Sequence, residues 1–366
     1  MNIGILGTRG VPPRYGGFET FVAELSARLV ERGHDVTVYC RVGTPVSSPV
    51  QRTWNGVRRI VIPAIGHKYL ETVSHTFLSA LDALRRDFDV ILLCNAANAF
   101  TIPILRAARL PVAINVDGIE RKRRKWNAMG RLVYATGEAL AATLASAVVA
   151  DAEVIAGYYR DQFSSSPVMI PYGADFPQEA DSDVLDRLDL GPRNYILYVS
   201  RFEPENNPLE VVEAYEKLSD APPLVMVGEG LYAKDLVEEL HRHAGPSVRF
   251  PGAIYGADYR TLQRNALIYV QATEVGGTHP ALIEAMGSGG AVLAHDTPEN
   301  REVGGASVGY FQLRPAESLS ARLRDWLVHP EEGEERRAPA RSRAAERYSW
   351  EAVTDAYERL FEELVP

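Results

Sequence analysis

Short apolar runs alternate with helical patterns along the whole chain, and this alternation limits the possible folds more than any other feature. The runs form two series, at residues 2–7, 35–40, 58–63, 90–95, 112–116 and 147–150, and then at 195–200, 224–227, 248–250, 267–271 and 292–294. Apolar strands separated by helices are typical of parallel sheets that are covered on both faces. The sequence therefore predicts an α/β fold with two Rossmann-like lobes, which suits a length of 366 residues.

The periodicity breaks between residues 171 and 192, where Tyr172-Gly-Ala-Asp and Gly191-Pro fall on either side of an acidic segment. We therefore expect a first lobe at residues 1–170 and a second at 171–348. Residues 349–366 place apolar side chains at helical spacing and predict a packed amphipathic helix, whereas the Arg-, Ala- and Glu-rich segment 333–346 predicts a solvated one. A ligand is expected in the cleft between the lobes, at the carboxyl ends of both sheets.

The charge is unevenly distributed. Residues 1–170 contain 20 Lys and Arg against 14 Asp and Glu, a net charge of +6, and the whole chain has −9, which leaves −15 for residues 171–366. An anionic partner is therefore expected at the first lobe. No secretion signal is visible, and the longest uncharged apolar stretch, near residues 139–150, is too short to span a membrane. We expect a cytoplasmic chain whose membrane contact is at most peripheral, with no cofactor and no metal, since the eight histidines lack ligand spacing.

The richest motif begins at Glu274 and predicts a phosphate site. Gly276 and Gly277 allow the backbone to approach a ligand closely, and a helix that begins near His279 or Pro280 offers N–H groups to an anion. Glu284, about one turn into that helix, can accept hydrogen bonds from sugar hydroxyls. The alternative is an ordinary glycine turn between a strand and a helix, with Glu284 facing solvent.

In each lobe, the loop after the first strand is a further candidate for anion binding. Gly16 and Gly17 begin a helix and offer a second anion-binding terminus, although their spacing does not match the dinucleotide fingerprint and so disfavours NAD. Arg201 lies just past its strand, where a guanidinium suits a phosphate. The alternatives are a plain surface loop at Gly16 and a surface ion pair from Arg201 to Glu203 or Glu205.

These motifs, in this order, closely resemble those of retaining glycosyltransferases of the GT-B fold, of the family 4 type. The branch that they resemble most is that of the bacterial rhamnosyltransferases. The resemblance rests on the Gly16-Gly17 loop and on residues 201–208, 275–286 and 298–303. It extends over nearly the full length, including a final helix from Ser349-Trp350 that in this fold crosses back onto the first lobe.

The resemblance implies a role for each matching position. The second lobe would hold a nucleotide sugar, with Arg201 on the diphosphate and Glu284 on the ribose. Gly16 and Gly17 would close over the diphosphate from the first lobe. The backbone around the phosphates and the sugar would come from Gly276, Gly277, Thr278 and His279.

Three positions depart from the family pattern. The usual pair of glutamates has seven residues between them, but Glu274 and Glu284 have nine, so Gly276 falls at the first glutamate position. Asn206 replaces a lysine of the diphosphate site, where we still expect it near the donor. Asp117 replaces a histidine of the first lobe and could orient or deprotonate an acceptor hydroxyl, or else cap the helix that follows. The expected catalytic residues are Asp117, Arg201 and Glu274.

A basic run in the first lobe predicts the acceptor or membrane contact. It comprises Arg121, Lys122, Arg123, Arg124, Lys125 and Trp126, in a helix expected to continue with Met129 and Val133 along one side. Such a run beside a tryptophan suits an anionic lipid or a lipid diphosphate, although a solvated helix face is an equal alternative. Nucleic acid is disfavoured because the overall charge is negative.

The predicted function is transfer of a sugar, L-rhamnose from dTDP-rhamnose, to an acceptor with retention at the anomeric carbon and without a metal. A lipid-diphosphate-linked sugar of cell-surface polysaccharide synthesis is the expected acceptor. Two alternatives stay open: a nucleotide-sugar epimerase of the same architecture, which would need no acceptor, and a two-lobe binding protein that turns nothing over.

Overall fold

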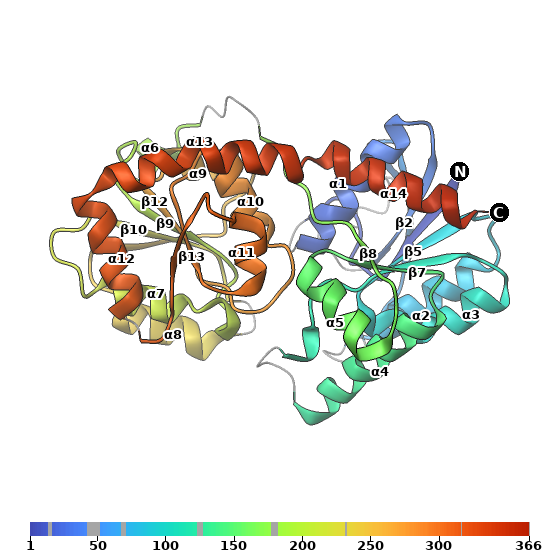
Figure 1. The fold of residues 1–366 in the computed structure, drawn as a ribbon. Helices are drawn as coiled ribbons and strands as arrows, with labels where there is room; N and C mark the ends of the chain where they lie inside the picture. The colour runs from blue at the N-terminus through green and yellow to red at the C-terminus, as the bar shows by residue number, and fades with distance from the viewer. Residues whose placement is uncertain are drawn as a thin grey trace. The chain divides into compact units, whose positions relative to one another are not determined.

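The computed structural model describes residues 1–13, 17–41, 52–66, 71–122, 127–176, 182–230, 233–315 and 317–365 (Figure 1). The chain divides into two compact units. The first comprises Met1–Gly173 with Trp350–Pro366, and the second comprises Ala174–Ser349. Each unit contains its own sheet with helices on both faces, so the predicted α/β fold with two Rossmann-like lobes is confirmed.

The first unit is built on an eight-stranded sheet in the order β3-β4-β2-β1-β5-β6-β7-β8, parallel except for the β3–β4 pair. Its strands are β1 (Asn2–Leu6), β2 (Asp35–Arg41), β3 (Thr53–Trp54), β4 (Val57–Ile62), β5 (Val90–Cys94), β6 (Val112–Asn115), β7 (Ala147–Ala150) and β8 (Val168–Met169). Its helices are α1 (Gly17–Glu31), α2 (Glu71–Ala83), η1 (Ala96–Thr101), α3 (Ile102–Ala107), η2 (Glu120–Lys122), α4 (Ala128–Leu144), α5 (Glu153–Phe163) and α14 (Trp350–Leu364). Apolar residues of α1 and α14 form the core on one face of the sheet, and those of α2 to α5 form it on the other.

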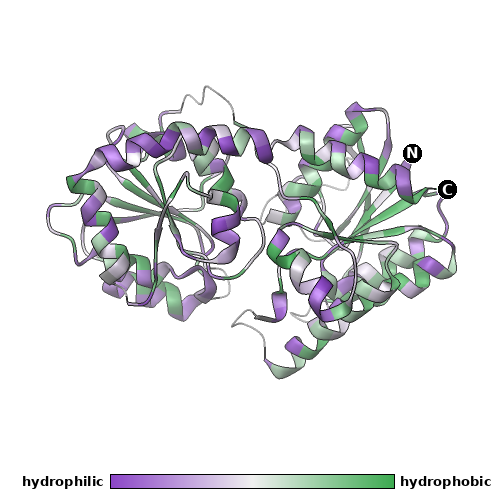
Figure 2. Cartoon of the chain, in the orientation of Figure 1, coloured by the Kyte–Doolittle hydropathy of each residue, from purple (hydrophilic) through white to green (hydrophobic). Residues whose placement is uncertain are grey.

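The second unit is built on a six-stranded parallel sheet in the order β11-β10-β9-β12-β13-β14. Its strands are β9 (Ile196–Val199), β10 (Leu224–Val227), β11 (Val248–Gly252), β12 (Ile268–Gln271), β13 (Val292–His295) and β14 (Gly309–Phe311). Its helices are α6 (Val184–Arg187), η3 (Pro204–Asn206), α7 (Pro208–Tyr215), α8 (Lys234–His243), α9 (Gly256–Asn265), α10 (Pro280–Gly287), α11 (Pro298–Gly304), α12 (Glu317–Val328) and α13 (Pro330–Arg347). The apolar residues shown in green in Figure 2 concentrate in the strands, while the outer helix faces are hydrophilic.

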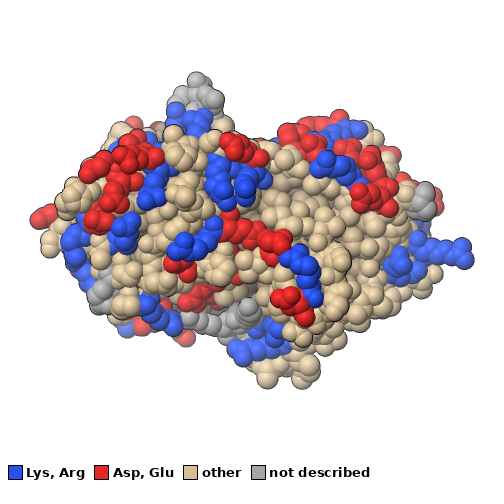
Figure 3. Space-filling view, viewed as in Figure 1, with Lys and Arg blue, Asp and Glu red and all other residues tan. Residues whose placement is uncertain are grey.

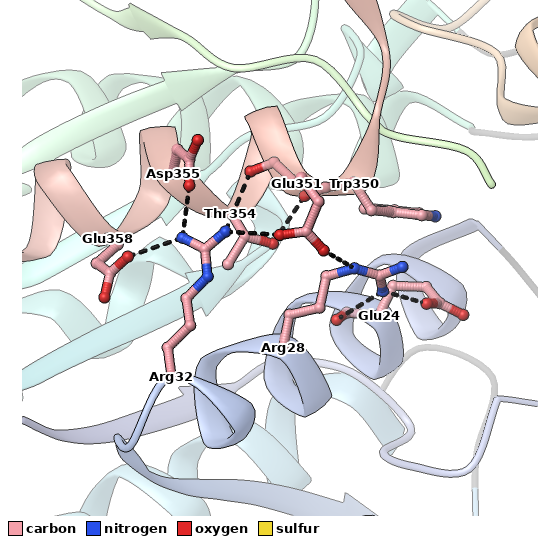
Figure 4. Close-up of polar contacts among 8 residues, drawn as sticks. All are labelled: Glu24, Arg28, Arg32, Trp350, Glu351, Thr354, Asp355 and Glu358. Carbon is pink, nitrogen blue, oxygen red and sulfur yellow. Dashed lines mark hydrogen bonds and ion pairs between the residues drawn. The ribbon is translucent and has the colours of Figure 1, made fainter. Parts of the chain in front are cut away.

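Helix α14 packs onto the first unit through apolar and charged contacts. Tyr357 and Phe361 are fully buried beside α1. Gly173 leaves room for the Trp350 ring, because a Cβ there would lie 2.6 Å from its Cδ2. Arg32 on the end of α1 forms ion pairs with three carboxylates of α14, which Figure 4 shows as Glu351, Asp355 and Glu358. The carboxyl-terminal helix is therefore an integral part of the first unit.

The prediction of one helix that contains the basic run from Arg121 and continues to Val133 is wrong in its extent. A short 3-10 helix covers Glu120–Lys122, and α4 begins only at Ala128. Asn127 is the N-cap of α4, and its side chain accepts a hydrogen bond from the N–H of Gly130. An asparagine in this position accepts from an N–H of the first helical turn and so starts α4 at Ala128. The apolar spacing alone did not reveal this start.

Candidate functional site

The strand order of the second unit reverses between β9 and β12 (Figure 1). Loops that leave two such strands run to opposite faces of the sheet, so their carboxyl ends border a crevice where ligands bind in this class of fold. The loop after β9 carries Arg201, and the loop after β12 carries Glu274, Gly276 and Gly277. The topology thus brings two motifs that lie about 70 residues apart in sequence to one edge of the sheet.

Buried polar groups join these two loops. The N–H of Glu274 donates to the carbonyl of Glu205 over 2.9 Å, and Nδ2 of Asn207 donates to the carbonyl of Ala272 over 2.8 Å. Asn206 is only 5% exposed, and its Nδ2 donates to the carbonyl of Arg201 over 2.7 Å. Asn206 therefore holds the backbone of the Arg201 loop.

The Arg201 guanidinium is 38% exposed and lies near the Glu203 carboxylate, with 3.5 Å between Nη1 and Oε1. The ion pair considered in the sequence is therefore present. An ion pair at this exposure contributes little free energy, on the order of 0–1 kcal/mol. The guanidinium can consequently turn to an anionic ligand at small cost.

The glycine turn before α10 depends on a close approach of a side chain to Gly276. A Cβ at this position would lie 2.4 Å from Nε2 of His279, so only glycine leaves the imidazole where it is. His279 is the N-cap residue, and α10 begins at Pro280, as the sequence predicted. A helix start of this kind, with its positive dipole end, suits an anion.

Asn300 of α11 fixes the imidazole of His279. Its Nδ2 donates to the carbonyls of His295 and Thr273 at 2.9 and 3.3 Å, so its Oδ1 is the acceptor that lies 2.9 Å from Nδ1 of His279. Nδ1 of His279 therefore carries a proton that it donates to Asn300, while Nε2 lies beside Gly276. The fully buried Asn300 was not identified as a site residue from the sequence.

Glu284 does not simply face solvent. Its Oε2 accepts a hydrogen bond from the hydroxyl of Tyr259 on α9, over 2.6 Å. Burial, and then the charge of Glu284, raise the pKa of Tyr259 well above its usual value of about 10. Glu274 on the preceding loop is partly exposed, and its carboxylate lies close enough to His295 to oppose the lowering of the pKa of His295 by burial.

In the first unit, Asp117 follows β6 and has a left-handed backbone with φ of 55°. Its N–H donates to Oδ1 of Asn115 over 2.9 Å, and its Oδ1 accepts from the hydroxyl of Tyr172 over 3.1 Å. Asp117 is not the cap of α4, because Asn127 has that position. The turn therefore fixes a half-buried carboxylate at the carboxyl edge of the first sheet.

The remaining expected residues are partly outside the described chain. Gly17 is the first residue of α1, while Gly16 lies outside the described residues. Nε of Arg121 lies 3.0 Å from Oε2 of the buried Glu138, and its Nη2 donates to the hydroxyl of Tyr158, so its charge has an internal partner. Lys122 ends η2, and the predictions for Arg123, Arg124, Lys125 and Trp126 fall outside the described residues. Within the described ranges, no cluster of three or more His, Cys, Asp or Glu could hold a metal ion.

Two family models cover most of the chain, one in each unit. Residues 16–173 match the model described as a glycosyl transferase 4-like domain, and residues 187–346 match the model described as glycosyl transferases group 1. No curated protein sequence matches the chain.

Several solved structures share the fold at low sequence identity. Sucrose-phosphate synthase from Thermosynechococcus elongatus has a TM-score of 0.87 at 18% identity, over 99% of this chain and 98% of that one. Anabaena HepE in complex with UDP and glucose has a TM-score of 0.81 at 16% identity, with both chains covered fully. The UDP-forming α,α-trehalose-phosphate synthase from Burkholderia vietnamiensis has a TM-score of 0.77 at 11% identity, also over 100% of both chains.

Proposed function

We propose that this chain, which is a glycosyltransferase of the GT-B type, binds a nucleoside-diphosphate sugar at the carboxyl edge of its second sheet. The observation that carries this proposal is the hydrogen-bonded junction of two loops at the strand-order reversal. There, Arg201 and the start of α10 lie on loops joined through Glu205, Asn207 and Glu274. An exposed cation and a helix N-terminus on joined loops suit a diphosphate.

Each group has a proposed role in the transfer. Arg201 and the backbone N–H groups of Gly277, Thr278 and His279, just before α10, would stabilise the negative charge that grows on the departing diphosphate. Nε2 of His279, which lies beside Gly276, would accept a hydrogen bond from a donor sugar hydroxyl. Glu284 would accept a hydrogen bond from the nucleoside sugar, and Asn206 would act by holding the Arg201 loop.

The proposed reaction is a metal-independent transfer of L-rhamnose from dTDP-rhamnose with retention of configuration. The bond between the anomeric carbon and the diphosphate oxygen breaks, a bond to the acceptor hydroxyl oxygen forms on the same face, and the hydroxyl proton passes to a carboxylate or to the leaving diphosphate. We propose Asp117 as the carboxylate that orients the acceptor hydroxyl. The similarity of residues 201–208 and 275–286 to rhamnosyltransferases supports the choice of sugar, and HepE structures with UDP and UDP-glucose support a pyrimidine nucleotide donor.

Thermal unfolding in the presence of a panel of nucleoside-diphosphate sugars tests the donor. A ligand that binds only the folded state stabilises it by about 2.7 kcal/mol at a concentration of 100 times its Kd. We expect dTDP-rhamnose to raise the Tm most, and dTDP alone to raise it as well, because the diphosphate and the deoxyribose are retained. A panel in which UDP-glucose or another donor gave the largest rise would refute rhamnose, and a panel without any effect would refute the donor site.

The exposed apolar face of α4 supports a lipid-linked acceptor. Met129, Leu132 and Val133 are 68%, 61% and 45% exposed, and the charged residues of the helix are only Arg131 and the buried Glu138. Neighbouring α2, on the same face of the sheet, exposes further apolar side chains, and Figure 3 shows few charged residues over this part of the unit. No helix in the described part of the chain is long and apolar enough to cross a bilayer.

We propose that this face, together with the basic run at residues 122–126, rests on an anionic membrane. Arg121 is left out of this contact because Glu138 already compensates its charge. Apolar side chains that enter the interface add to the electrostatic attraction of the basic residues, each of which contributes on the order of 1 kcal/mol. The lipid carrier of the acceptor sugar would lie in that membrane.

Flotation with phosphatidylglycerol vesicles tests this contact through Leu132→Asp. An exposed leucine that loses its burial in the interface and gains a negative charge costs well over 1 kcal/mol, so we expect at least a tenfold weaker vesicle binding. Val328→Asp is the matched control, because Val328 is 66% exposed but lies on α12 of the second unit. Equal flotation of the wild type and Leu132→Asp, or no flotation of either, would remove the membrane from the proposal.

A further inference from the structure

We propose that Tyr259 is a positioning residue of the donor site, which acts by holding the Glu284 carboxylate in the orientation that accepts a hydrogen bond from the nucleoside sugar. The inference rests on the proposed function, since it concerns how tightly a nucleoside diphosphate binds. No motif of the sequence pointed to Tyr259, which lies 25 residues before Glu284 on a different helix.

The contact is direct and has one possible direction. The Tyr259 hydroxyl lies 2.6 Å from Oε2 of Glu284, a length typical of a hydrogen bond to an ionised carboxylate. The raised pKa of Tyr259 keeps the phenol protonated at any ordinary pH, so the tyrosine donates and the carboxylate accepts. The phenol thus holds one carboxylate oxygen from the side of α9.

A third residue sets the rotation of the phenol O–H. Gln263, one turn further along α9, is fully buried, and its Nε2 donates to the Tyr259 oxygen over 2.7 Å. The same Nε2 lies 3.3 Å from the carbonyl of Ala281, in the first turn of α10. Because the phenol oxygen accepts from Gln263, its proton is directed to Glu284, and the three side chains form one directional chain between the two helices.

Helix α9 has other anchors, so the loss of one hydroxyl leaves it in place. Asp258 receives hydrogen bonds from Ser182 and Arg187, and the Tyr195 hydroxyl donates to the carbonyl of Leu262 over 2.5 Å. Tyr259→Phe therefore removes the hydrogen bond to Glu284 and one of the two acceptors of Gln263 Nε2, which keeps the carbonyl of Ala281. Without the phenol, the ligand must supply more of the ordering of Glu284, which we expect to weaken nucleoside-diphosphate binding roughly tenfold.

Isothermal titration calorimetry of the full chain tests the inference with two ligands, dTDP and inorganic diphosphate. We expect Tyr259→Phe to weaken dTDP about tenfold and to leave inorganic diphosphate unchanged, because only dTDP has a sugar for Glu284 to bind. Tyr195→Phe, which also removes a hydroxyl bonded to α9, is the matched control and should bind both ligands as the wild type does. In the Glu284→Gln background, Tyr259→Phe should add less than about a twofold further loss, since a positioning residue needs the group it positions.

Each other result contradicts a specific step. If the wild type binds no nucleoside diphosphate, the proposed function fails and the positioning role fails with it. If Glu284→Gln weakens dTDP but Tyr259→Phe does not, the donor site stands and the positioning role is overturned. An equal loss for inorganic diphosphate, or a full additional loss in the Glu284→Gln background, would reduce Tyr259 to a general structural residue. Should Tyr259→Phe not fold, Gln263→Met is the second variant, because it keeps the phenol but removes the group that donates to it. We expect the same pattern of binding with a smaller loss of dTDP affinity.

Discussion

Replacement of Arg201 by alanine is expected to lower kcat about 10²-fold, the loss typical of a preorganised donor that meets transition-state charge. The guanidinium follows the first strand of the second sheet, is 38% exposed, and has its Nη1 3.5 Å from Oε1 of Glu203. In the ground state it would contact a diphosphate that is still shared with the sugar. As the bond to the anomeric carbon breaks, the diphosphate gains charge, and the interaction with Arg201 grows.

The same variant should fold normally, because the loss of an exposed side chain changes stability by about 0.5 kcal/mol or less. Steady-state transfer and thermal unfolding of one preparation separate the two effects. Arg201→Lys should be intermediate, since an ammonium keeps the charge but not the bidentate geometry. Arg324→Ala on α12 is a control for the loss of an exposed arginine in this unit. Unchanged kcat in a folded Arg201→Ala protein would exclude this residue from the site.

Asp117→Asn is expected to leave donor binding intact and to reduce transfer by at least 10²-fold, the lower end of the contribution of a general base. Asparagine keeps the shape of the side chain, tolerates the left-handed backbone and can still accept a hydrogen bond from Tyr172. The variant therefore changes the charge and the proton affinity but not the turn. Donor affinity by calorimetry and transfer by product analysis, measured over a range of pH, distinguish the two roles.

A control for this variant is Asp161→Asn, which makes the same change at an exposed position of α5. Transfer rates equal to the wild type at every pH would leave Asp117 as a residue of the turn only. A simultaneous loss of donor affinity would instead place Asp117 in the donor site, contrary to the proposed division of roles between the two units.

The sequence predicted the central strands well, since a buried parallel strand needs a continuous apolar run. Each of the predicted runs corresponds to an observed strand. The short strands β3 (Thr53–Trp54), β8 (Val168–Met169) and β14 (Gly309–Phe311) were missed, because two or three residues at the margin of a sheet contain no such run. The solvated helix expected at 333–346 was only half right. Helix α13 buries one face there. Arg337 on that face is only 7% exposed, and its guanidinium donates hydrogen bonds to the carbonyls of Ala266, Leu267 and Gly289.

The residues of the candidate site also fall into two groups, those that a local sequence motif predicts and those that only the fold brings to the site. Arg201, Gly276 and the start of α10 could be identified because loop, glycine and helix-start signals lie within a few residues of each other. Tyr259, Gln263 and Asn300 could not, since each comes from a neighbouring helix. Tyr259 meets Glu284, Gln263 meets Tyr259 and Asn300 meets His279 only through the packing of α9 and α11 beside α10. Asn300 lies in the segment 298–303 that carries the family resemblance, but nothing in the sequence around Tyr259 and Gln263 distinguishes them from ordinary polar positions on a helix.

Hydrogen exchange of the full chain with and without saturating dTDP tests most directly whether the nucleotide binds at the edge of the second sheet. We expect slower exchange of backbone amides in two segments, residues 200–207 and 275–284, because a bound diphosphate would accept hydrogen bonds from the amides just before α10 and order the Arg201 loop. Peptides from the far ends of the same strands should exchange at unchanged rates. Protection confined to the first unit, or no protection in either segment at a dTDP concentration that raises the Tm, would contradict a donor site built on Arg201, Gly277 and Glu284.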